Sequence, residues 1–167
     1  NAAGIVGNLD TRADELTLSG IVGRAAFSAG QFHYQSDGYR ENNDVEYDIY
    51  TLFGQAALTD TLSLQAELRS RRSEQGDLAQ NFDPDDFSRD SRTDIDQDTA
   101  RVGLRYSPTP RVDLLASVIV SDRESSQIQA EDEFTFTDDI KQTGSDTQVQ
   151  GIYRGDLFNV TAGGGFA

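Results

Sequence analysis

The sequence predicts an all-β protein, an antiparallel meander of about eight or nine long strands. Three observations predict this fold class. Apolar and polar residues alternate along segment after segment, as they do in strands, because successive side chains point to opposite faces. No segment keeps the 3.6-residue period of a helix for three turns. Short and long connections alternate between the strand segments, and the short ones are typical of hairpins.

The alternation is clearest in residues 62–72, LSLQAELRSRR, where the leucines and Ala66 share one face. Gln65, Glu67, Arg69 and Arg71 share the other face. The same pattern predicts eight further strands, and the count falls to eight in all if the first of them is a loop. In chain order these strands are residues 2–9, 15–23, 27–36, 48–58, 99–106, 112–122, 147–154 and 157–166.

The connections differ sharply in length and composition. The short ones are TDT (59–61), SPTPR (107–111) and GD (155–156), and the prolines of SPTPR suit a turn because they cannot donate to a ladder. The long ones are polar and mostly acidic. They are expected to be loops over residues 37–47, 73–98 and 123–146.

Composition excludes several classes of protein. The net charge is -15, from 14 basic and 29 acidic residues, which argues against nucleic acid as a partner because phosphate binding needs a basic surface. No run reaches the ~18 apolar residues of a transmembrane helix. Cysteine is absent, so disulfides and thiolate metal sites are excluded.

Strand length and loop asymmetry favour one kind of β-protein. Strands of ~9–11 residues, with short turns at one rim and long loops at the other, are typical of transmembrane β-barrels. Strands of soluble sandwiches are nearer ~5–6 residues. We therefore expect residues 1–167 to form a single β-barrel segment, with the leucines of 62–72 toward lipid. The alternative is a soluble or surface-exposed β-sheet module that binds a partner or cations through its acidic loops.

The strand count bears on whether the barrel is closed. Nine strands joined by hairpins do not fit the even number found in bacterial single-chain barrels. We therefore expect a curved open sheet whose first and last strands do not pair, from a larger barrel in a longer chain. With eight strands, a closed small barrel is the alternative.

Charged residues collect on the polar face of the predicted strands, which a barrel would turn toward its lumen. They form a ladder that would face the acidic loop 73–98, as in the constriction of a porin, where a transverse field orders polar solutes. The alternative is that these charges only neutralise one another. The ladder consists of Glu67, Arg69, Arg71, Arg101, Arg105, Arg123 and Arg154.

The acidic loop is also a candidate cation site, and Ca²⁺ is the ion that clustered carboxylates suit. The loop lacks the glycine and glutamate positions of an EF-hand, and a solvated acidic loop is the alternative. We expect no other cofactor. The candidate ligands are Asp83, Asp85, Asp86, Asp94, Asp96 and Asp98.

His33 is the single histidine. Ser36, Asp37 and Asp48 are its candidate neighbours for acid–base chemistry, but no signature spacing supports an active site. We expect no enzyme activity.

Three stretches resemble the β-barrel region of Gram-negative outer-membrane proteins: GQFHYQSDGYRENND, EQGDLAQNFDPDDF and DTARVGLRYSPTPRVDLLASVI. The nearest similarity is to porin-like or receptor-like barrels that follow tetratricopeptide repeats in a longer chain, although no such repeat is visible here. The resemblance covers most of the 167 residues. It implies a location in the bacterial outer membrane, contact with its lipid, and a role in transport or assembly, with small polar solutes as candidate cargo.

Overall fold

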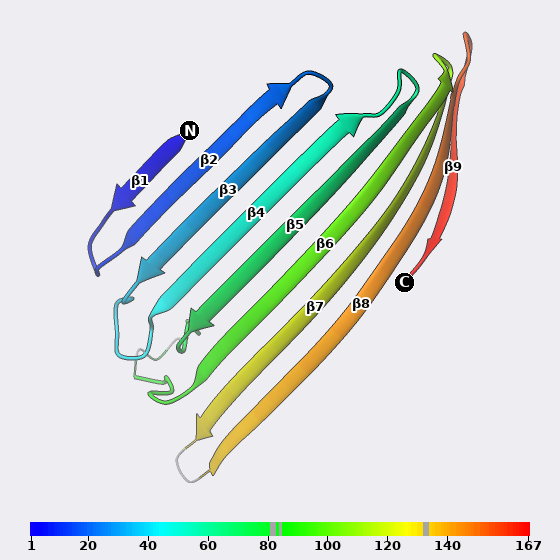
Figure 1. The fold of residues 1–167 in the computed structure, drawn as a ribbon. Helices are drawn as coiled ribbons and strands as arrows, with labels where there is room; N and C mark the ends of the chain where they lie inside the picture. Colours follow the sequence, from blue (N-terminus) through cyan, green and yellow to red (C-terminus); the bar gives the residue numbers. More distant parts are fainter. Residues whose placement is uncertain (81–82, 84, 132–133) are drawn as a thin grey trace.

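Nine strands form one antiparallel sheet in the computed structural model, which describes residues 1–80, 83, 85–131 and 134–167. The strands are hydrogen-bonded in chain order from β1 to β9 (Figure 1). Their bounds are β1 Ala2–Val6, β2 Arg12–Val22, β3 Ala25–Ser36, β4 Val45–Ala57, β5 Leu62–Gln75, β6 Arg92–Thr109, β7 Val112–Glu131, β8 Phe134–Arg154 and β9 Asn159–Phe166.

The predicted open meander is confirmed. β1 pairs only with β2 and β9 only with β8, so the sheet does not close within the described ranges. These ranges contain no helix long and apolar enough to cross a bilayer.

Several expected connections are wrong in extent: β4 begins at Val45, inside the expected loop 37–47, and β6 continues to Thr109, inside the expected turn 107–111. The two longest expected loops differ most. β6 already begins at Arg92, inside the expected loop 73–98, and most of the expected loop 123–146 is strand in β7 and β8. Residues 81, 82 and 84 of the first loop and 132–133 of the second lie outside the described residues. The extra strand is mostly polar, and its few apolar residues, among them Phe134, Phe136 and Ile140 on one face of β8, are separated by polar and acidic residues, so the alternation was missed.

The register separates two faces of the sheet. Leu68 pairs across the sheet with Leu52 and Ala100, and every second residue from them shares that face. A band of apolar residues crosses this face, and the paired rows place all of them together. The band contains Leu18, Leu52, Leu64, Leu68, Val102, Leu104, Val118, Val120, Val149 and Val160.

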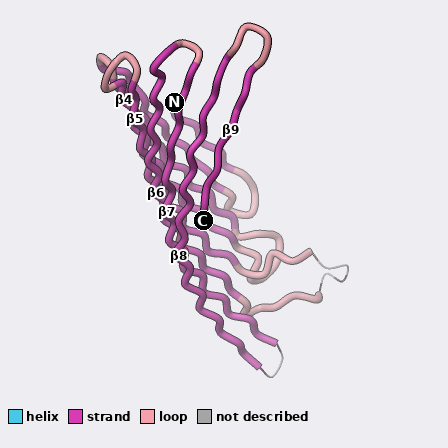
Figure 2. The backbone as a smooth tube through the Cα atoms, turned by 90° about the vertical axis from the view of Figure 1, so that its right-hand side faces the viewer, coloured by secondary structure: helices cyan, strands magenta, loops and turns pink. Residues whose placement is uncertain are grey.

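The sheet is curved into a trough. In Figure 2 its two edges lie on the same side of β4 and β5, and the long loops project to that side. The trough has a volume of about 1250 Å³ and is lined from β2 to β9 by residues that include Ala26, Gln65, Ser117 and Gln150. These residues alternate with the apolar band, so the band is on the convex face and the polar residues are on the concave face.

The apolar band is not a core. No hydrophobic residue of the described chain is buried, and Leu18, Leu68 and Val149 of the band are 64%, 55% and 58% exposed. The few buried side chains are polar. Three of these, Ser36, Asn43 and Ser73, lie where the long loops meet the sheet, so the packed part of the molecule is the loop-bearing end of the concave side.

Candidate functional site

The concave face carries the predicted charged ladder. Glu67 pairs with Arg101, and Arg71 shares a row with Gln97 and Arg123. Because alternate residues of a strand share a face, the register places all seven ladder residues on the concave face. That the face lines a lumen stays a prediction. The seven residues are Glu67, Arg69, Arg71, Arg101, Arg105, Arg123 and Arg154.

At the end of the short turns, two ladder arginines converge on Asp113 of β7. Arg105 donates to Asp113 Oδ1 at 3.0 Å, and Arg154 and Ser107 also donate to this carboxylate. The Asp113 side chain is only 4% exposed, so three donors replace the water it loses. The sequence contained a signal for this site, because Asp113 has the same strand parity as Arg105 and Arg154, but our prediction missed it.

In the middle of the sheet, Arg101 lies 3.8 Å from Glu67. Mutual neutralisation therefore accounts for Arg101, Arg105 and Arg154. It does not account for the other three arginines. Among the described residues, Arg69, Arg71 and Arg123 form no ion pair, and the Arg71 guanidinium lies 5.7 Å from the Tyr47 ring.

The acidic residues of the predicted loop separate into two groups. Asp83, Asp85 and Asp86 lie in the loop, where the Asp85 and Asp86 amides donate to Asp83. Asp94, Asp96 and Asp98 lie instead in β6, on the convex face, so they do not face the ladder. The predicted Ca²⁺ ligands do not gather into a group of three within the described part of the chain.

The loop 76–91 is held to the connection 37–44 by buried and half-buried polar groups. Arg40, whose side chain is 9% exposed, donates to the carbonyl oxygens of Asp77 and Ala79 at 3.1 and 2.6 Å. The guanidinium also lies 4.8 Å from the Phe87 ring. This connection was predicted only as polar loop, because nothing in the sequence indicates which loop residues meet.

Asp77 is the electrostatic centre of this contact. Burial raises its pKa, but the amides of Ser88 and Ala79 donate to the carboxylate, and Arg40 lies 3.5 Å away. These interactions favour the ionised form and leave the pKa of Asp77 below its ordinary value of 3.8. The ionised carboxylate therefore joins the two parts of the loop around Ala79 and Ser88 to each other and pairs with Arg40 of the connection 37–44.

Of the neighbours predicted for His33, Asp48 is in contact with it and Ser36 is not. Asp48 is beside it at 2.9 Å, as considered from the sequence, but Ser36 is on the concave face and bonds Thr11. Glu46 and Gln35, which the sequence did not single out, complete the surroundings of His33 on the convex face. The alternation of β3 and β4 was the available signal, because it puts Glu46 and Asp48 on one face.

No protein-family model matches this sequence, and no curated protein is significantly similar to it. The function must therefore be inferred from the geometry.

Proposed function

We propose that the chain forms part of the wall of a transmembrane β-barrel in a bacterial outer membrane, serving a pore or transporter. The convex face contacts lipid and the concave face lines a water-filled passage. The long connections form the rim that narrows this passage, and the short turns form the other rim.

The observation that carries the proposal is the exposed apolar band on a sheet without a core. In β7 the band runs from Val112 to Val120, roughly nine residues, which is close to the ~9–11 that a tilted strand needs to cross a bilayer. Soluble monomers rarely expose more than a few hundred Å² of contiguous apolar surface, whereas this band crosses strands from β2 to β9. Contact with the hydrocarbon of a bilayer would cover this exposed apolar band.

The edges of the band support the same reading. Tyr106, Tyr153 and Phe158 lie beside the short turns, and the Tyr153 and Phe158 rings are 6.1 Å apart. Tyr50 lies at the opposite edge, in the same row as Asp98 and Asp122. Aromatic residues at both edges followed by charged residues are typical of the two interfaces of a membrane barrel.

The outer edges of β1 and β9, which pair with no described strand, support an assembly larger than this sheet. The outer edges of β1 and β9 present backbone donors and acceptors that no described residue satisfies. In lipid each such group costs several kcal/mol. We therefore propose that further strands, from the same or another chain, pair with both edges and close the barrel.

Site-directed spin labelling tests the lipid and lumen assignments. The chain has no cysteine, so Leu68→Cys and Thr51→Cys each provide a unique label, one on each face of neighbouring strands. In vesicles we expect the label at 68 to be accessible to oxygen and the label at 51 to a water-soluble nickel complex.

Equal accessibility at the two positions would contradict the proposal. A chain that stays monomeric in buffer without detergent and unfolds cooperatively would favour the alternative, a soluble β-sheet module.

A further inference from the structure

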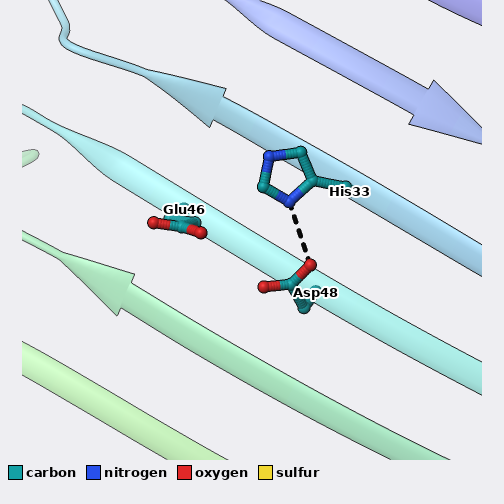
Figure 3. A group of neighbouring side chains, drawn as sticks. All are labelled: His33, Glu46 and Asp48. Carbon is teal, nitrogen blue, oxygen red and sulfur yellow. Dashed lines mark hydrogen bonds and ion pairs between the residues drawn. The ribbon is translucent and has the colours of Figure 1, made fainter.

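A cluster of metal-ligating side chains lies on the convex face, beyond the apolar band and on the loop side. His33 of β3 pairs directly with Asp48 of β4, and Glu46 is two residues before Asp48 on the same strand face. Figure 3 shows the three side chains together over β3 and β4. Their ligand atoms all lie within 4.8 Å of one another.

The histidine ring is already oriented for this role. Its Nε2 lies 3.3 Å from Gln35 Oε1, which accepts a hydrogen bond from that nitrogen, and Nδ1 lies 2.9 Å from Asp48 Oδ1. Metal-binding histidines commonly donate one ring N–H to an oxygen, which fixes the tautomer and directs the other nitrogen to the metal. Here that other nitrogen donates to Asp48 Oδ1, so a bound metal would replace the proton between them.

The neighbouring cations do not neutralise these carboxylates. Arg72, opposite Asp48 on β5, is paired with Asp96 at 3.3 Å, and Arg12 is paired with Asp10 at 2.7 Å. Glu46 has no ion pair among the described residues. Asp48 is paired with His33 itself at 2.9 Å, so the excess of negative charge that a divalent cation would offset is that of Glu46.

We propose that His33, Asp48 and Glu46 form a binding site for a divalent first-row transition metal of the zinc class. One imidazole and two carboxylates suit such an ion, and ligand atoms of a tetrahedral zinc ion are about 3.3 Å apart. The ligand atoms now lie within 4.8 Å of one another, so the carboxylates must move closer when the ion binds. The bound ion joins β3 to β4 beside the connection 37–44, and this inference does not depend on the proposed function.

Copper titration of the full chain, folded in detergent micelles, tests the site. Because the chain has one histidine, nitrogen splitting in the Cu²⁺ EPR spectrum that depends on His33 reports this site alone. We expect one Cu²⁺ bound with coupling to a single imidazole nitrogen. His33→Gln should abolish that coupling, and Gln35→Ala should weaken binding by about tenfold.

Glu46→Gln provides a second test on an exposed side chain that leaves the sheet intact, and it should weaken Zn²⁺ binding in calorimetry while keeping the nitrogen coupling. The matched control is Glu124→Gln, also on the convex face but paired with Lys141, which should bind as the parent does. Unchanged binding in His33→Gln, or equal losses in Glu46→Gln and Glu124→Gln, would overturn the site.

Discussion

Asp113 links three strands at the short-turn end of the trough. It lies in β7, and its carboxylate accepts hydrogen bonds from Arg105 of β6 and Arg154 of β8. Both arginines are about half exposed, whereas the carboxylate is almost fully covered. Loss of these hydrogen bonds would therefore leave the covered carboxylate without a partner, whereas the arginines could still be solvated by water.

We expect Asp113→Asn to lower the stability of the folded chain more than a surface pair does. The amide removes the charge from all three hydrogen bonds and brings two arginines together without a counter-charge. The matched control is Asp156→Asn, which breaks the exposed pair with Arg111 at 2.8 Å. Urea unfolding in detergent measures both variants, and equal midpoints would contradict a structural role for Asp113.

Leu64 and Gln65 are adjacent residues on opposite faces of β5, so they report which face meets lipid. In bilayers we expect Leu64→Arg to cost about 2–4 kcal/mol, because a guanidinium near the midplane loses its hydration. Gln65→Arg should cost far less because its side chain stays in water. Reversible unfolding from lipid vesicles measures both, and equal costs at the two positions would contradict the assignment.

At the scale of elements, the Asp77 carboxylate joins Ala79 and Ser88 within the loop 76–91 and pairs with Arg40 of the connection 37–44. The pKa of Asp77 is lowered in the folded chain, so its ionised form contributes stability above its unfolded value of 3.8. That contribution is lost as the pH falls through the lower folded pKa. We expect the Ser88 amide, which donates to Asp77 at 2.7 Å, to lose protection from hydrogen exchange in this acidic range.

NMR measures this exchange after correction for the intrinsic rate at each pH. Asp77→Asn should leave Ser88 weakly protected at every pH. Asp85→Asn, a loop change without this contact, should keep the pH dependence of the parent chain. If Ser88 were protected equally in the parent chain and in Asp77→Asn, the hydrogen bond from Ser88 to Asp77 would not hold the loop.

Two glycines of β9, Gly163 and Gly165, lie against the backbone of β8. A Cβ atom at Gly163 or Gly165 would lie 2.5 Å from the carbonyl oxygen of Val149 or Thr147. Such a distance requires the backbone to shift, so only glycine allows β9 to approach β8 this closely.

For the whole molecule, charge is divided unequally between the faces. The chain carries a net charge of -15, yet Arg69, Arg71 and Arg123 lie on the concave face without an acidic partner among the described residues. Charges of one sign along a passage raise the local concentration of the opposite ion. In the proposed passage these three arginines would favour anions at their own height, while Asp146, which also lines the trough, would act against them.

We expect replacement of Arg69, Arg71 and Arg123 by Gln to shift the ion preference of the assembled pore toward cations. Planar-bilayer recording under a salt gradient measures this as a change of reversal potential. Arg101, Arg105 and Arg154 are the comparison set, because their charges are partly offset by Glu67 and Asp113. Equal shifts for the two triple variants would show that local pairing has no effect.

The fold followed from the sequence where one face of a strand is apolar. In 62–72 the leucines alternate with polar residues, so the strand, its two faces and its hairpin links were all predictable. The outward parts of β6, β7 and β8 were not predictable in this way. Apolar residues such as Phe134 and Phe136 are few there and most positions are polar, so these parts are extended by cross-strand hydrogen bonding without a continuous apolar face.

The sequence by itself determined which residues share a face, because strand parity is a local property: the arginines of the ladder and the leucines of the band could be grouped without coordinates. Only the tertiary structure decided which of them meet. Asp113 with its arginines, Arg40 with Asp77, and His33 with Glu46 depend on register and loop packing. These relations join residues distant in the chain, and a one-residue slip of a strand would separate them.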